Sequence, residues 1–101
     1  MQVEHGMRFE LRLAAEDAEG ARFQLSVRVP DAAWAGAAEI AGPSGAIHFH
    51  FEPAQTPPEW CLSIVRASLR TLFRERSARG GYPPRIARWR PQPQAPGDET
   101  S

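Results

Sequence analysis

The chain has 101 residues, is formally neutral and contains a single cysteine. A chain of this length forms one domain with one modest core, and one cysteine excludes a disulfide within the chain. Its first residues lack the basic and apolar pattern of a signal peptide, and no apolar run approaches the roughly 20 residues needed to cross a bilayer. We therefore expect a reduced, cytoplasmic protein that does not enter a membrane.

The charges are unevenly distributed along the chain. Eight of the 12 arginines lie between Arg66 and Arg90, where Glu75 is the only acid. The first 60 residues carry four arginines and nine acids, whereas the rest of the chain carries eight arginines and three acids. This asymmetry predicts one cationic and one acidic surface, and it indicates an anionic partner.

Three segments, Met7 to Leu13, Arg22 to Val29 and Ala46 to Glu52, place apolar side chains at every second position. This period of two is typical of strands with one buried and one wet face, and it favours an antiparallel sheet. The segment Asp31 to Ala41 is compatible with a strand or with a short alanine-rich helix. The turn residues 42–45 directly before the third strand favour the strand.

One long helix is predicted over about residues 57–79. Thr56 and Glu59 have the spacing of a capping box, Pro57 suits the first helical position, and Gly80 marks the end. The apolar face of this helix would lie on the sheet, and it comprises Cys61, Leu62, Ile64, Val65, Leu69, Leu72 and Phe73.

The segment Arg85 to Arg90 follows two prolines and predicts a short final strand at a sheet edge. The expected fold class is α+β: an antiparallel meander of three to four strands packed against one long helix, in the order β-β-β-β-α-β. The single domain would span residues 7–90, after an N-terminal arm of residues 1–6. Residues 91–101 offer almost nothing to bury and are expected to form a disordered tail.

Arg66, Arg70 and Arg74 stand four residues apart and form a stripe beside the apolar face of the predicted helix. No acid of the helix lies three or four residues away to offset them, so the stripe favours an external anion, either carboxylates or phosphates. The alternative is a solvated stripe, or one paired with acids such as Glu10 and Glu52.

Aromatic residues alternate with arginines in the segment from Tyr82 to Arg90. Such rings can stack on bases while arginines follow a phosphate backbone, so nucleic-acid binding is the second interpretation. Against it, the first 60 residues are acidic and the sequence contains no helix-turn-helix, zinc-finger, RRM or KH signature. Trp89 is equally compatible with a core residue that closes one end of the sheet.

His48, His50 and Glu52 alternate along one predicted strand, about 6.6 Å apart on one face, and are a weak candidate for a metal site. Further ligands would have to come from His5, Glu10 or Glu39. None has a diagnostic spacing, so we predict neither a metal nor a cofactor.

Cys61 lies near the start of the helix, where the dipole lowers a thiol pKa. It also lies at the centre of the apolar face, which favours the interpretation that it packs as a small hydrophobic side chain.

No catalytic motif is present, so the protein is not expected to be an enzyme. We predict a noncatalytic module that binds an acidic protein surface through Arg66, Arg70, Arg74, Arg85, Arg88, Trp89 and Arg90. The alternatives are nucleic-acid binding through the same arginines with Tyr82 and Trp89, a metal-dependent activity at His48 and His50, and self-association between the acidic and basic surfaces.

Overall fold

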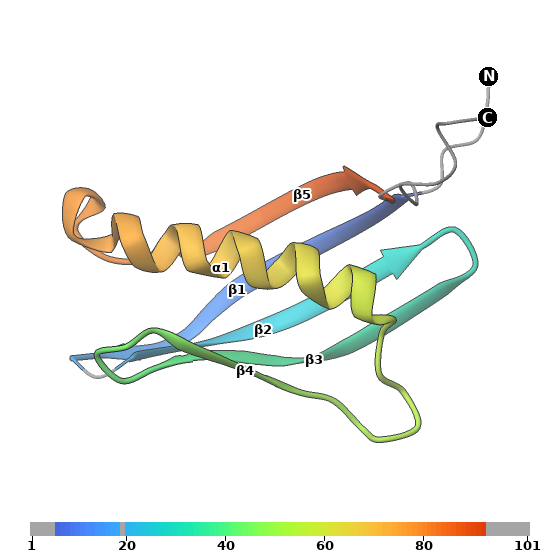
Figure 1. Cartoon of the computed structure of the whole chain (residues 1–101), viewed down its shortest axis with the longest axis horizontal. Helices are drawn as coiled ribbons and strands as arrows, with labels where there is room; N and C mark the ends of the chain where they lie inside the picture. Colours follow the sequence, from blue (N-terminus) through green and yellow to red (C-terminus); the bar gives the residue numbers. More distant parts are fainter. Residues whose placement is uncertain (1–5, 19, 93–101) are drawn as a thin grey trace, which may run out of the picture.

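The computed structural model describes residues 6–18 and 20–92, which form one antiparallel sheet with a helix across one face (Figure 1). The elements are β1 (Gly6–Asp17), β2 (Gly20–Val29), β3 (Ala32–Ala41), β4 (Ala46–His50), α1 (Glu59–Arg79) and β5 (Arg85–Pro91). The predicted α+β class and the order β-β-β-β-α-β are confirmed.

The strands lie in the order β4-β3-β2-β1-β5. The first four form a meander, and the chain then crosses the sheet through α1 and returns to pair β5 with β1. This crossing places β4 and β5 at opposite edges of the sheet, so two segments that flank the helix in sequence are separated in space (Figure 1).

The strand interpretation of residues 31–41 is confirmed, because β3 pairs with β2 along its whole length. Two glycines form the following turn with positive φ angles, 66° at Gly42 and 77° at Gly45. A side chain is disfavoured in this conformation. At Gly45 a Cβ atom would also come within 2.6 Å of the Phe73 ring, so the turn packs closely against the helix.

The core lies between the sheet and α1. Alternate residues of β1, β2 and β3 point toward the helix, which buries its own apolar face against them. The fully buried side chains of largest volume are Phe9, Phe23, Met7, Leu11, Ile40, Leu69, Val27, Val65 and Cys61. The predicted helix face is correct, since Cys61, Leu62, Val65, Leu69 and Leu72 are buried and Ile64 and Phe73 pack against the core.

The predicted capping box is wrong, because the helix begins at Glu59 rather than at residue 57. Pro58 disfavours the helical conformation at the residue before it, which keeps Pro57 out of the helix. Pro58 itself is extended, with φ −59° and ψ 153°, and its carbonyl accepts hydrogen bonds from the first turn. The Thr56 hydroxyl donates instead to the carbonyl of Glu52, at 3.2 Å.

Several predicted boundaries also move. β1 begins at Gly6, inside the predicted arm, and continues to Asp17 through an irregularity after Leu13. β4 ends at His50, two residues before the predicted end, and β5 includes Pro91. The rest of the predicted arm and the predicted tail from residue 93 onward lie outside the described residues. Within the described ranges, no helix has the length and apolar character needed to cross a membrane.

Candidate functional site

The seven residues predicted to bind a partner do not form one surface. The guanidinium of Arg66 lies over the Phe49 ring of β4, 5.4 Å from the ring centroid. Arg85, Arg88 and Arg90 belong to β5, at the other edge of the sheet. The helix stripe and the final strand are therefore two separate cationic surfaces.

The stripe on α1 turns gradually away from the sheet. Each step of four residues advances about 40° beyond a full turn, so Arg74 lies further from the β4 side than Arg66. Arg66 donates to Glu59 at 3.2 Å, an acid seven residues earlier that the spacing argument overlooked. Arg74 donates to the Thr71 hydroxyl at 3.3 Å, and Arg70 is exposed without a hydrogen bond or ion pair to any described residue. The stripe is thus partly neutralised at its start and solvated beyond it.

Arg85 is engaged within the sheet. It donates to the carboxylate of Glu10, which also accepts a hydrogen bond from Arg12 at 3.1 Å. The bond from Arg85 is the main reason why the pKa of the Glu10 carboxyl lies below its ordinary value, and Arg12 acts in the same direction against the effect of burial. Glu10 thereby holds together β1 and β5 on the face of the sheet opposite the helix.

On this open face of the sheet, the pairing register places Arg8 of β1 directly opposite Arg28 of β2 and Trp89 of β5. Neither Arg8 nor Arg28 makes an ion pair or hydrogen bond with another described residue. Trp89 is 45% exposed, so the interpretation of Trp89 as a core residue is wrong. A Cβ at Gly6 would come within 2.7 Å of the Trp89 ring, so this ring lies against the end of β1.

Beside this row of side chains the open face is hollowed, with a cavity of about 630 Å³. Its floor consists of small side chains, because alternate positions of β2, β3 and β5 carry Ser26, Ala33, Ala35 and Ala87. Its polar walls are Arg8, Glu10, Arg28, Gln55 and Arg85. A ligand can approach the backbone plane here while cationic groups surround it. We call this surface, with Trp89 at its margin, the open-face site.

The two aromatic residues proposed to stack on bases lie on opposite sides of the sheet. Tyr82 is half-buried and packs edge-on against Phe23, with ring centroids 5.7 Å apart and an interplanar angle of 86°. Burial is also the main cause that raises the pKa of the Tyr82 hydroxyl. Phe23 belongs to the core face, whereas Trp89 lies on the open face. A single bound strand of nucleic acid therefore cannot stack on both rings at once.

The weak candidate run of His48, His50 and Glu52 does not alternate along one strand, because β4 ends at His50 and Glu52 lies beyond it. His50 Nε2 instead lies 3.3 Å from one carboxylate oxygen of Glu39, and Arg22 donates to the other oxygen at 3.0 Å. In the described part of the chain, no group of three His, Cys, Asp or Glu side chains is placed to hold a metal ion. His5, one suggested further ligand, lies outside that part.

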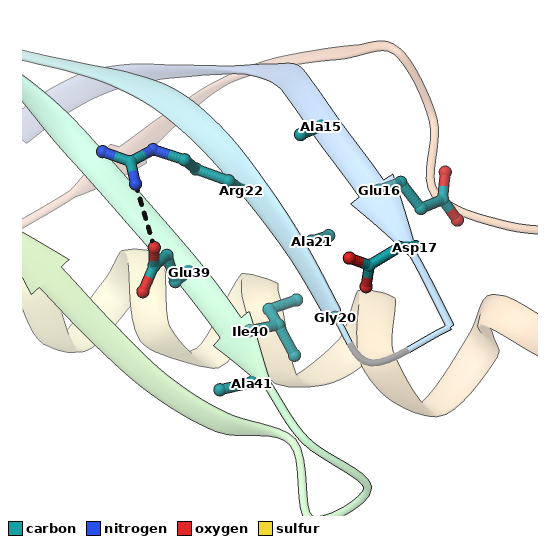
Figure 2. Close-up of a pocket in the computed structure, with 9 residues that line it drawn as sticks. All are labelled: Ala15, Glu16, Asp17, Gly20, Ala21, Arg22, Glu39, Ile40 and Ala41. Carbon is teal, nitrogen blue, oxygen red and sulfur yellow. Dashed lines mark hydrogen bonds and ion pairs between the residues drawn. The ribbon is translucent and has the colours of Figure 1, made fainter.

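A second hollow, of about 260 Å³, lies near the β1–β2 turn. Figure 2 shows the Arg22–Glu39 ion pair on one side of it, the Asp17 carboxylate near Ala21 and Gly20, and Glu16 turned outward. The Glu16 carboxylate lies beside Gly81, where a Cβ would come within 3.2 Å of it. The acidic groups of this hollow are therefore distributed over three directions instead of converging on one point.

Cys61 has no exposed surface, and burial raises the pKa of its thiol to about 11. Desolvation outweighs the helix dipole, so the hydrophobic interpretation of Cys61 is the correct one. A protonated, inaccessible thiol has no use as a nucleophile.

Sequence reasoning missed Arg8 and Arg28 as site residues, although it placed both on the wet face of their strands. The missing information was the register: strands paired one residue further along would not have brought these two arginines opposite each other. Comparisons of the chain with protein families, with curated proteins and with solved structures find no match.

Proposed function

We propose that this protein is a noncatalytic interaction module that binds an acidic segment of a partner protein at the open-face site. One observation carries the proposal: Arg8 and Arg28 lie directly opposite each other on neighbouring strands, beside the exposed Trp89, and neither forms an ion pair with a described residue. Like charges directly opposite on neighbouring strands are destabilising by roughly 0.2–1 kcal/mol. A bound carboxylate relieves this repulsion, and guanidinium groups bind carboxylates in a favourable two-bond geometry.

The distribution of charge favours a protein segment over a nucleic acid. Glu10 lies at the middle of the open face and Glu39 lies further along it, so the positive potential is interrupted. A phosphate backbone carries a charge at every nucleotide, and its affinity rises with the number of phosphates that cationic groups neutralise. A peptide can instead present carboxylates to Arg8 and Arg28 alone, and an apolar side chain to Trp89.

The proposal is tested with a short labelled peptide in which glutamate and valine alternate, and with a single-stranded oligonucleotide of similar length. Fluorescence anisotropy measures the affinity of each for the wild type, for an Arg8→Gln, Arg28→Gln double variant, and for Arg70→Gln. Arg70 is a matched control, because it is also exposed and unpaired but lies on α1.

We expect the double variant to weaken peptide binding at least about tenfold, which corresponds to about 1.4 kcal/mol, and Arg70→Gln to leave it unchanged. An equal loss in both variants would show that only net charge matters and would return the helix stripe to consideration. Tighter binding of the oligonucleotide than of the peptide, with a steep dependence on salt, would refute the proposal in favour of nucleic-acid binding.

A further inference from the structure

The outer edge of β5 has a defined pattern of backbone groups. The amide of Leu13 donates to the carbonyl of Pro84 at 2.9 Å, which makes these two residues a hydrogen-bonded pair of the antiparallel ladder. Such pairs occur at every second position, so Ile86, Arg88 and Arg90 direct their backbone groups toward β1. The amides and carbonyls of the alternate residues, 85, 87 and 89, therefore point outward.

The outward carbonyls are covered by the neighbouring arginines. The guanidinium of Arg88 donates to the carbonyl of Ala87 at 3.0 Å, and that of Arg90 donates to the carbonyl of Trp89 at 2.9 Å. Both arginines are exposed and bind no carboxylate in the described structure, so these contacts are weak and are easily exchanged. The edge consequently presents backbone donors together with two guanidinium groups, a combination that suits an anionic chain.

We infer that an acidic segment of the partner binds as a sixth strand, antiparallel to β5, along this edge. The inference rests on the proposed function: one stretch of the acidic segment is held along the edge of β5, and the stretch that continues beyond the edge supplies the carboxylates that reach Arg8 and Arg28 on the open face. On binding, the backbone of the segment takes over the outward amides and carbonyls of Ala87 and Trp89, as an added strand does at an exposed sheet edge. Arg88 and Arg90 leave those carbonyls and pair with carboxylates of the segment.

The alternation of β5 also fixes the side-chain pattern of the segment. Arg88 and Arg90 are opposite Phe9 and Met7 of β1, so their side chains lie on the helix face of the sheet, whereas Trp89 lies on the open face. An antiparallel segment therefore needs acids at every second position, opposite the two arginines, and an apolar residue between them beside Trp89.

A second copy of the chain is a poor occupant of the same edge. Two β5 strands paired with each other would bring Arg85, Arg88 and Arg90 of one copy close to the same residues of the other. Opposed like charges destabilise such a pair, as charged edge residues do in many sheets. The arginines thus select against self-association and for an acidic strand.

The test uses two N-methylated forms of the glutamate–valine peptide. In an antiparallel sixth strand the valines lie opposite Ala87 and Trp89, and their amides donate to β5, whereas the glutamate amides point to solvent. We expect N-methylation of the valines to weaken binding to the wild type at least about tenfold, and N-methylation of the glutamates to leave it nearly unchanged.

A variant of the protein, Ala87→Pro, tests the same hydrogen bonds from the side of β5. Proline removes the outward amide of residue 87 but no hydrogen bond to β1, and it is tolerated at the edge of a sheet. Ala87→Ser changes the side chain at the same position of the open-face site but keeps the amide, so it is the reference for the proline variant. We expect the proline variant to bind the peptide at least about tenfold more weakly than the serine variant, while the melting temperatures of the two variants stay close. The added strand would be refuted if the two methylated peptides bind with equal affinity, or if only methylation of the glutamates lowers the affinity. The proposed function survives such a result as long as the unmethylated peptide binds and the Arg8→Gln, Arg28→Gln variant binds it more weakly. Absence of binding by any acidic peptide would refute both.

Discussion

Replacement of Leu69 by alanine tests the packing of α1 on the sheet. Leu69 is fully buried at the centre of the helix face. The substitution removes three carbon atoms, and the lost transfer free energy of about 0.8 kcal/mol for each gives about 2.4 kcal/mol. The cavity that remains adds a further cost, because a helix held against five strands cannot collapse completely into it. We therefore expect the free energy of unfolding to fall by about 2.5 to 5 kcal/mol.

Urea unfolding, followed by circular dichroism, measures this loss. Ser63→Ala is the matched control, because Ser63 is an exposed position of the same helix and its replacement should change stability by no more than about 0.5 kcal/mol. Ile40→Val removes one carbon from the sheet side of the core and should cost about 0.5 to 1.5 kcal/mol, a change that leaves most of the protein folded. A loss below about 1 kcal/mol for Leu69→Ala would refute the packing of this helix face on the sheet.

Three further predictions concern single residues. The lowered pKa of Glu10 stabilises the fold at pH values above the ordinary value of 4.5, and this contribution is lost as the pH falls through the pKa of the folded state. In urea unfolding, Glu10→Gln should therefore lower the free energy of unfolding more at neutral pH than near pH 3. An equal loss at both pH values would contradict the ion pairs of Glu10 with Arg12 and Arg85. Cys61 should react with a disulfide reagent at pH 8 only as fast as the protein unfolds, and rapid labelling of the native protein would show that the thiol is accessible. Gly20→Ala should lower the melting temperature by several degrees, because the added Cβ would lie 2.2 Å from the carbonyl oxygen of Ile40. Calorimetry measures this change. An unchanged melting temperature would mean that β2 and β3 separate easily at this end.

The strands β1, β2 and β4 and the helix α1 were predictable because each has a periodicity that only one backbone conformation satisfies, whereas residues 31–41 fitted both a strand and a helix. Alternating apolar residues in β1 and β2 define a buried face irrespective of the partner strand. The start of α1 was not predictable from the capping pattern alone, since Pro57 precedes another proline and the local restriction on its backbone outweighs the capping signal. The end of α1 at Gly80 was correct, because its φ of 79° requires a residue without a side chain.

The candidate site was less predictable than the fold, because it depends on which strands are neighbours. The sequence places Arg8 and Arg28 on wet faces, but their contact requires the register of β1 with β2. The position of Trp89 beside them requires in addition that β5 returns to β1 and not to β4. Strand order and register are fixed by packing across the whole sheet, and a local pattern contains little of that information.

The high density of arginines between Arg66 and Arg90 suggested one continuous binding surface, yet the fold divides it between the helix, where Arg66 lies beside β4, and β5 at the other edge of the sheet. The surface that we propose as functional draws its charges from three strands distant in sequence. Such a surface exists only in the folded state, unlike a basic tail, which attracts anions whether or not the domain is folded. Peptide affinity should therefore disappear over the same range of urea in which the sheet unfolds. Binding that persists in the unfolded chain would mean that arginine content alone, and not its arrangement on the sheet, attracts the peptide.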